Sequence, residues 1–274
     1  MRRATPRRPA APPDAAAEAE AHYLRMWRLR QMSPGELRLL LAGEDVAPWI
    51  ESAARYGVAE AQVRLAQMHL DGAGAPRDAG VALAWFTRAA RKGSAEAMNM
   101  VGRCHENGWG AAEDLAAAAR WYRASAEAGH DWGQYNYANL LFDGRGVGRD
   151  QRQAVVWYGR AAGQGHARAM NLLARCCEEG WGTPRDTAVA YAWYRRAAEG
   201  GYFRAQYNYA TLLAAEGRMD DALGWFETAC RAATPDSRRG LIDGLARRPD
   251  PRLSALGRRL AGACPLTPEL SIGR

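Results

Sequence analysis

The sequence predicts an all-α protein built as a stack of 36-residue helix-turn-helix repeats. A tryptophan, a glycine and an aspartate each recur every 36 residues, in register with one another. The tryptophans are Trp85, Trp121, Trp157 and Trp193, the glycines are Gly57, Gly93, Gly129, Gly165 and Gly201, and the aspartates are Asp78, Asp114, Asp150 and Asp186. A period of this length is typical of proteins in which each unit packs only on its neighbours.

The second helix of each unit is expected to begin at the recurring aspartate, whose carboxylate can accept from free backbone N–H groups. Its apolar positions share one helical face, as in Ala82, Trp85, Phe86 and Ala89. The recurring glycine follows the helix, where a left-handed residue usually ends it. We expect the aromatic residues, including Trp121, Trp157 and Trp193, to fill the core between layers.

The first helix of each unit is expected to end at a pair of glycines separated by one residue. The pairs are Gly72/Gly74, Gly108/Gly110, Gly144/Gly146 and Gly180/Gly182. Glycine supplies the positive φ that a tight reversal needs. These runs lack the spacing of a phosphate-binding loop, and no strand is expected before them, so we interpret them as repeat turns.

These motifs resemble the Sel-1-like repeats, relatives of the tetratricopeptide repeats. The resemblance is plainest in QYNYA at 134–138, in DGRGV at 143–147, and in Trp157–Tyr158 followed by Ala161–Ala162. It covers residues 57–231 and implies a right-handed α-solenoid. The usual role of the family is that of an adaptor that binds other proteins, and the family has no single partner and no shared active site.

The domain organisation follows from where the repeat pattern weakens. We expect a disordered basic tail at 1–13, N-terminal helices with a degenerate capping repeat at 14–56, repeats at 57–231 and capping helices with a tail at 232–274. The repeat block contains four clean units and a shortened one, because Trp225 follows Trp193 by only 32 residues. Ser33 and Glu36 read as a capping box, and Thr234-Pro235 and Asp250-Pro251 each read as an N-cap followed by proline.

The net charge of +7 is not concentrated on the repeats. It divides into +2 for residues 1–56, +1 for residues 57–231 and +4 for residues 232–274. A nucleic-acid binder more often gathers basic side chains on one face of its folded body. The distribution therefore argues against nucleic acid as the partner, although Arg-rich flanks keep that alternative open.

The cysteines and the hydropathy bear on location. Five cysteines, an odd number without CxxC spacing, favour free thiols and a reducing compartment, with Cys104 and Cys230 buried on helices. No uncharged apolar run reaches 18 residues, so we expect no membrane insertion. The sequence thus predicts a cytoplasmic protein.

No residue pattern predicts a catalytic, cofactor-binding or metal site. His69 and His105 recur on the core face of first helices, where a buried, hydrogen-bonded role is the simpler interpretation than a metal site. His130 and His166 follow the inter-repeat glycines, where we expect exposed turns. An enzyme with residues scattered along a groove remains an alternative to the adaptor.

A second periodicity points to a binding surface. Residues 94–110 and 166–182 are identical at 10 of 17 positions, whereas residues 94–110 and 130–146 agree at only 2. The difference falls on the face of the first helix opposite the expected core, at i, i+4 and i+7. This face comprises Asn99, Arg103, Glu106, Tyr135, Asn139, Phe142, Asn171, Arg175, Glu178, Tyr207, Thr211 and Ala214.

The function expected from this face is binding of a protein or peptide segment. By resemblance to the family, first helices line the concave side of the solenoid. Asn and Arg can donate to a peptide backbone and to acidic groups, and Tyr is typical of binding hot spots. Recent duplication of a two-repeat unit would explain the alternation equally well, and that alternative stays open.

Overall fold

The computed structural model describes residues 47–263 and, before them, residues 21, 24, 25, 27, 28, 31–33, 35 and 36. Within this part every regular element is a helix, which confirms the predicted all-α class. The helices between residues 47 and 263 are α3 (Ala47–Tyr56), α4 (Ala59–Asp71), α5 (Ala79–Ala90), α6 (Ala95–Asn107), α7 (Leu115–Glu127), α8 (Asp131–Asp143), α9 (Gln151–Gly163), α10 (Ala167–Glu179), α11 (Thr187–Glu199), α12 (Phe203–Ala215), α13 (Met219–Ala232), α14 (Pro235–Ala246) and α15 (Pro251–Ala263).

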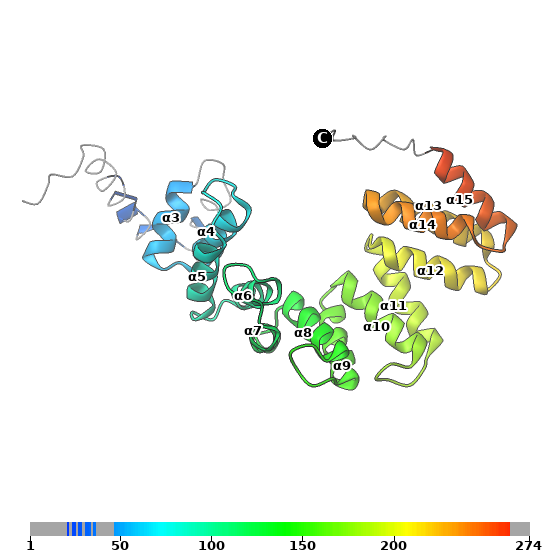
Figure 1. Cartoon of the computed structure of the whole chain (residues 1–274), viewed down its shortest axis with the longest axis horizontal. Coiled ribbons are helices and arrows are strands. Elements are labelled where there is room, and N and C mark those ends of the chain that lie inside the picture. Colours follow the sequence, from blue (N-terminus) through cyan, green and yellow to red (C-terminus); the bar gives the residue numbers. More distant parts are fainter. Residues whose placement is uncertain are drawn as a thin grey trace, which may run out of the picture. The chain divides into compact units, whose positions relative to one another are not determined.

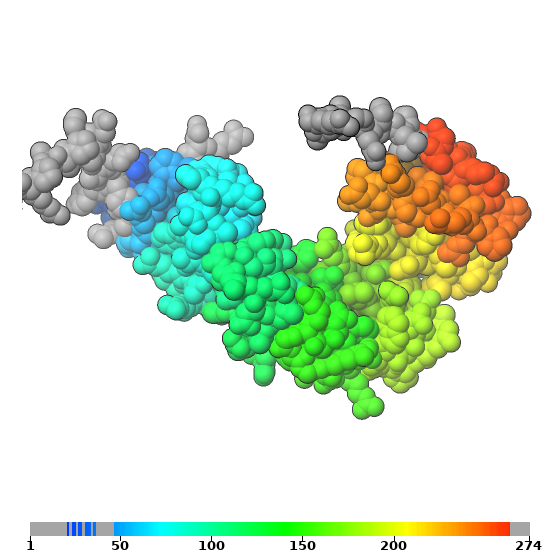
Figure 2. Space-filling view, in the orientation of Figure 1, coloured from blue at the N-terminus to red at the C-terminus, as the bar shows by residue number. Residues whose placement is uncertain are grey.

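The chain forms two compact units, the first ending at Gly133 and the second beginning at Gln134. Within each unit, helices adjacent in sequence pack on one another, as expected for a solenoid of helical pairs (Figure 1). In the second unit the pairs α10–α11 and α12–α13 each form a tight hairpin, and α11 packs on α12. The atoms of α10 to α15 follow one another as a continuous body in the space-filling view (Figure 2).

The predicted helix starts are confirmed at all four recurring aspartates. The side chains of Asp78, Asp114, Asp150 and Asp186 each accept from the backbone N–H three residues further on, at 2.8–3.0 Å. An N-cap of this kind satisfies one of the N–H groups that the first helical turn leaves without a partner. The inter-repeat glycines, such as Gly165, have positive φ as predicted.

Two turn glycines are needed for contact between neighbouring repeats. A Cβ on Gly110 would lie 2.2 Å from the carbonyl oxygen of Ala79, and a Cβ on Gly182 would lie 2.2 Å from that of Gln151. Both glycines also have positive φ, at 76° and 69°. The turn of one repeat therefore rests directly on the backbone at the start of the preceding repeat's second helix.

The centre of each repeat is the aromatic residue that follows the tryptophan. Tyr122, Tyr158 and Tyr194 are at most 2% exposed, and the equivalent Phe86 and Phe226 are fully buried. Alanines at 0% exposure surround them and let the helices approach closely. The prediction of core tryptophans is correct for Trp157, which is buried, whereas Trp121 and Trp193 are only half-buried.

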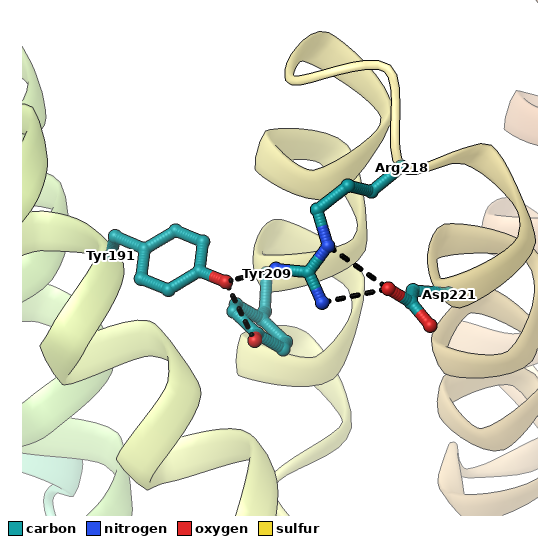
Figure 3. Close-up of polar contacts among 4 residues, drawn as sticks. All are labelled: Tyr191, Tyr209, Arg218 and Asp221. Atoms are coloured by element: carbon teal, nitrogen blue, oxygen red, sulfur yellow. Dashed lines mark hydrogen bonds and ion pairs between the residues drawn. The ribbon is translucent and has the colours of Figure 1, made fainter.

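The turn of the shortened repeat lacks the Gly-x-Gly pair but keeps one left-handed glycine, Gly217, and a side-chain network lies beside it (Figure 3). Arg218, at the start of α13, donates to the hydroxyl of Tyr191 on α11 at 2.9 Å and pairs with Asp221 at 2.6 Å. The hydroxyls of Tyr191 and Tyr209 lie 3.0 Å apart, and their rings meet edge to face. The guanidinium thus links α11 to α13.

Several predictions concern the two ends of the chain. Ser33 and Glu36 form the reciprocal hydrogen bonds of the predicted capping box, at 2.8 and 3.3 Å. Helices α14 and α15 begin at the two predicted prolines. Asp250 caps α15, but the side chain of Thr234 forms no cap bond and instead contacts Ser237. The expected tail at 1–13 and Cys264 lie outside the described residues.

Candidate functional site

The second unit contains a cleft of about 660 Å³ between its first helices. Its walls come from α8, α10, α12 and α14, together with Tyr194 of α11 and Tyr202 before α12. The lining residues are Tyr135, Arg168, Asn171, Leu172, Arg175, Glu178, Glu179, Tyr194, Tyr202, Phe203, Arg204, Tyr207, Asn208, Ser237, Gly240 and Leu241. We call this surface the second-unit cleft.

The second-unit cleft brings together five of the residues that the sequence placed on a binding face. They are Tyr135, Asn171, Arg175, Glu178 and Tyr207. Asn139, Phe142, Thr211 and Ala214 belong to the same unit but do not line the cleft, and all four are half-buried. Asn99, Arg103 and Glu106 lie on α6, in the first unit.

The asparagines of this face are more buried than a single-helix pattern suggests. Asn99 is 5% exposed and Asn171 is 6% exposed. The Oδ1 atom of Asn171 accepts from Nδ2 of Asn208 on α12 at 3.0 Å. A face opposite the core of its own helix pair is therefore not fully exposed, because neighbouring first helices also pack on each other.

The alternating residues at the C-terminal end of this face serve as acceptors for the buried tyrosines. The hydroxyl of Tyr194 donates to Glu178 at 2.8 Å, and that of Tyr122 donates to Glu106 at 2.6 Å. In the repeat between them, Tyr158 donates to Asn139 at 2.7 Å instead. Part of the two-repeat alternation is thus structural.

The aromatic residues of the predicted face contact other rings. Tyr135 stacks on His166 at 4.8 Å between centroids, and Tyr207 meets Phe226 edge to face at 4.9 Å. Phe142 lies 5.6 Å from Trp181. Thr211 donates to the backbone carbonyl of Tyr207. These contacts hold the rings in fixed positions, which lowers the entropy cost of using them for binding.

The arginines of the face lie over tryptophan rings. Arg103 lies 5.2 Å from the Trp109 centroid, and Arg175 lies 4.9 Å from the Trp181 centroid. Such cation–π contacts orient a guanidinium without neutralising its charge. The turn tryptophans Trp109 and Trp181 are half-buried beneath them.

The sequence interpretation missed several residues of the second-unit cleft. Arg168 and Arg204 occupy the second position of α10 and α12, 36 residues apart, and this recurrence could have identified them. Tyr202, Phe203 and Asn208 also line the cleft. They lie outside the i, i+4, i+7 series, so that series could not find them.

Three of the histidines have structural partners. His69 and His105 are half-buried rather than buried, and Nδ1 of His105 forms no hydrogen bond with the described residues, which differs from the predicted role. Nδ1 of His69 lies 3.0 Å from the Pro76 carbonyl. His166 is 6% exposed and its Nδ1 accepts from the backbone N–H of Ala169, and His130 is half-buried and accepts from Gly133. The expectation of exposed turns is therefore wrong, because both histidines act as helix caps. Among the described residues no three His, Cys, Asp or Glu side chains gather as metal ligands would.

The thiols and several tyrosine hydroxyls with raised pKa values are buried in the packing between helices. Burial raises the pKa of Cys104 to about 11 and that of Cys176 to about 12, which disfavours the reactive thiolate. Burial and the hydroxyl of Tyr191 raise the pKa of Tyr209 to about 12. These groups are therefore protonated near neutral pH and are poor nucleophiles or bases there.

A larger cavity of about 990 Å³ lies in the first unit, among residues of α3, α4 and α5. It is lined in part by Ser52, His69 and Trp85, and by none of the residues predicted to bind. No helix in the described part of the chain is long and apolar enough to cross a membrane.

Comparison with known families identifies the repeat. The family described as "Sel1 repeat" matches residues 59–94, 95–130, 133–166 and 167–202, which together make up just over half of the chain. The two helices of each clean unit fall inside these ranges, except that α8 begins two residues before the third range. A search of curated protein sequences found no match.

Solved structures share the same fold. A Sel1 repeat protein from Oxalobacter formigenes superposes with a TM-score of 0.70 at 24% identity, over 84% of this chain and 98% of that one. The Escherichia coli protein c5321, described as a protective antigen of uropathogenic strains with an SLR fold, gives 0.68 at 27% identity over 91% of this chain. That alignment covers 53% of c5321, so this chain spans about half of its length.

Proposed function

Because the chain belongs to the Sel1 repeat family, whose members are typically protein-interaction adaptors, we propose that it is a non-enzymatic adaptor that binds a protein segment on its first helices. The second-unit cleft is the proposed contact surface. The observation that carries this proposal is the convergence of five predicted residues, from α8, α10 and α12, on one cleft. Concave surfaces built by successive repeats are what solenoid proteins use for binding.

The chemistry of the second-unit cleft supports this assignment. It combines rigid aromatic rings, arginines held over other rings, and side-chain amides. Tyrosine and arginine are enriched among residues that dominate binding energy at protein interfaces. Asn99, Arg103 and Glu106 repeat part of this set on α6 and are proposed to form a separate contact surface within the first unit.

The test is affinity capture from extract of the source cells, with partners identified by mass spectrometry. The double variant Tyr135→Ala/Arg175→Ala changes two residues that line the cleft, and we expect it to lose a partner retained by the unmodified chain. Val156→Ala/Arg160→Ala is the matched control, because it removes an exposed apolar residue and an arginine from a second helix. Equal capture by both variants, with unchanged helical circular dichroism, would remove the cleft from consideration.

The chain is further proposed to work in a reducing compartment such as the cytoplasm. Cys104, Cys176, Cys177 and Cys230 are buried and unpaired on their helices, in support of this proposal. When protein isolated from source cells without reductant is unfolded in denaturant, a thiol assay should count five reactive thiols. A count of three or one would indicate disulfides and an oxidising location.

A further inference from the structure

Two arginines in the second-unit cleft are oriented but not neutralised. Arg175 lies over Trp181, and Arg204 lies 5.7 Å from the centroid of Phe203. Within the part of the chain that the structure describes, neither guanidinium forms an ion pair, and both are exposed. Ring-stacked guanidinium groups retain donors in a plane that matches the two oxygens of a carboxylate.

The positions of Arg175 and Arg204 determine how far apart two acidic groups of a bound peptide would have to be. Arg204 is the second residue of α12 and Arg175 is the ninth of α10, and the Asn171–Asn208 bond places corresponding positions of the two helices side by side. From the helical rise and usual helix spacing, their Cα atoms lie about 14 Å apart. An extended chain covers about this distance in four residues.

Between the two arginines lies a pair of amides suited to a peptide backbone. The Asn171–Asn208 hydrogen bond uses one oxygen and one nitrogen, which leaves Nδ2 of Asn171 and Oδ1 of Asn208 for the cleft that both residues line. One is a donor and the other an acceptor. An extended peptide presents the complementary N–H and C=O groups along its main chain.

The remaining charges of the second-unit cleft limit where an acidic group can bind. Glu178 and Glu179 lie at the C-terminal end of α10, and Glu178 already accepts from Tyr194. Arg168 adds a further positive charge beside Arg204, at the opposite end of α10. The positive end of the cleft also contains the rings of Tyr202 and Phe203.

We propose that the occupant of the second-unit cleft is an extended protein segment with two acidic side chains four residues apart. One carboxylate pairs with Arg204 and the other with Arg175, and the Asn171–Asn208 pair holds the main chain between them. This inference rests on the proposed function and adds the chemistry of the partner. It commits to Asp or Glu side chains rather than to phosphate groups.

The proposal of an acidic peptide partner can be tested by phage display. A random library of nine-residue peptides is selected against the full chain. Enriched peptides should carry Asp or Glu at positions i and i+4. Their synthetic, fluorescein-labelled forms should bind in an anisotropy titration, at least about tenfold more tightly than forms with Asn or Gln at those positions. Affinity should fall with added salt, as expected for exposed charge pairs.

Variants of the protein locate the contact. The double variant Arg175→Gln/Arg204→Gln should remove the preference for the acidic form, so that both peptide forms bind equally. The control Arg160→Gln/Arg196→Gln removes the same charge from α9 and α11, where both arginines also lie over tryptophan rings. It should leave the preference intact.

Four results would overturn the inference. Enrichment of peptides without an acidic bias would keep the proposed function and refute the acidic partner. If both double variants lost the preference for the acidic peptide equally, general charge attraction rather than the cleft would explain the binding. Tighter Arg175- and Arg204-dependent binding of a labelled 12-nucleotide RNA would assign the arginines to phosphate, and failure of any peptide to enrich would count against both proposals.

Discussion

The repeat formed by α8 and α9 and the repeat formed by α10 and α11 have the same fold but hold their helices together differently. In the first, the buried hydroxyl of Tyr158 donates to the amide oxygen of Asn139. In the second, the buried hydroxyl of Tyr194 donates to the carboxylate of Glu178. The difference teaches that an alternation on the surface of a repeat protein can originate in how each unit is packed.

Trp157 and Trp193, at equivalent positions of the two repeats, give the largest expected difference. Trp157 is buried at 8% exposure and meets Tyr137 edge to face, whereas Trp193 is half-buried. Trp157→Ala should lower the free energy of unfolding by about 3–5 kcal/mol, because a large buried side chain is lost. Trp193→Ala should cost clearly less. Equal shifts in melting temperature would contradict the difference in burial.

The tyrosine hydroxyls should give the next largest effect. Tyr194→Phe leaves a carboxylate without its donor and should cost about 1.5–3 kcal/mol, whereas Tyr158→Phe leaves a neutral amide and should cost about 0.5–1.5 kcal/mol. Urea denaturation at pH 7.5 measures both. A larger loss of stability in Tyr158→Phe than in Tyr194→Phe would show that the exposure of the acceptor, and not its charge, decides the loss of unfolding free energy.

The third effect appears only in alkaline solution. Burial raises the pKa of Tyr158 and Tyr194 above the ordinary value of about 10, and Glu178 raises that of Tyr194 further. A raised pKa in the folded state means that the stabilisation is complete below about pH 10 and is lost as the pH rises further. Urea denaturation between pH 9 and 11 should therefore show falling stability. The fall should be shallower in Tyr158→Phe/Tyr194→Phe, and an unchanged slope would rule these hydroxyls out as its source.

The fold could be predicted from the sequence because the same local determinants of helix start and end occur in each of the four repeats. Asp150 and Asp186 each cap a helix through a hydrogen bond to the backbone N–H three residues further on. Gly165 has the positive φ that is expected after the end of a helix. Such local determinants are visible without knowledge of neighbouring repeats. The helical period likewise identifies Tyr158 and Tyr194 as core residues.

The candidate site was only partly predictable because it depends on contacts between repeats. Asn171 lies opposite the core of its own helix pair, yet α12 covers it. His166 follows a turn glycine, yet it caps α10 and stacks on Tyr135. A helical wheel describes one helix and its face, and it contains no information on which residues the next repeat will bury.

The contact at Gly182 suggests how this protein could be extended by design. The glycine rests on the backbone carbonyl of Gln151, and Gly110 rests in the same way on that of Ala79, so the receiving side chain plays no part. A clean repeat grafted with both turn glycines should therefore dock onto any helix pair whose second helix begins at a capping aspartate. The α12–α13 pair lacks such a turn and is joined to α11 through Arg218 and Tyr191, so it is not transferable without that matching tyrosine.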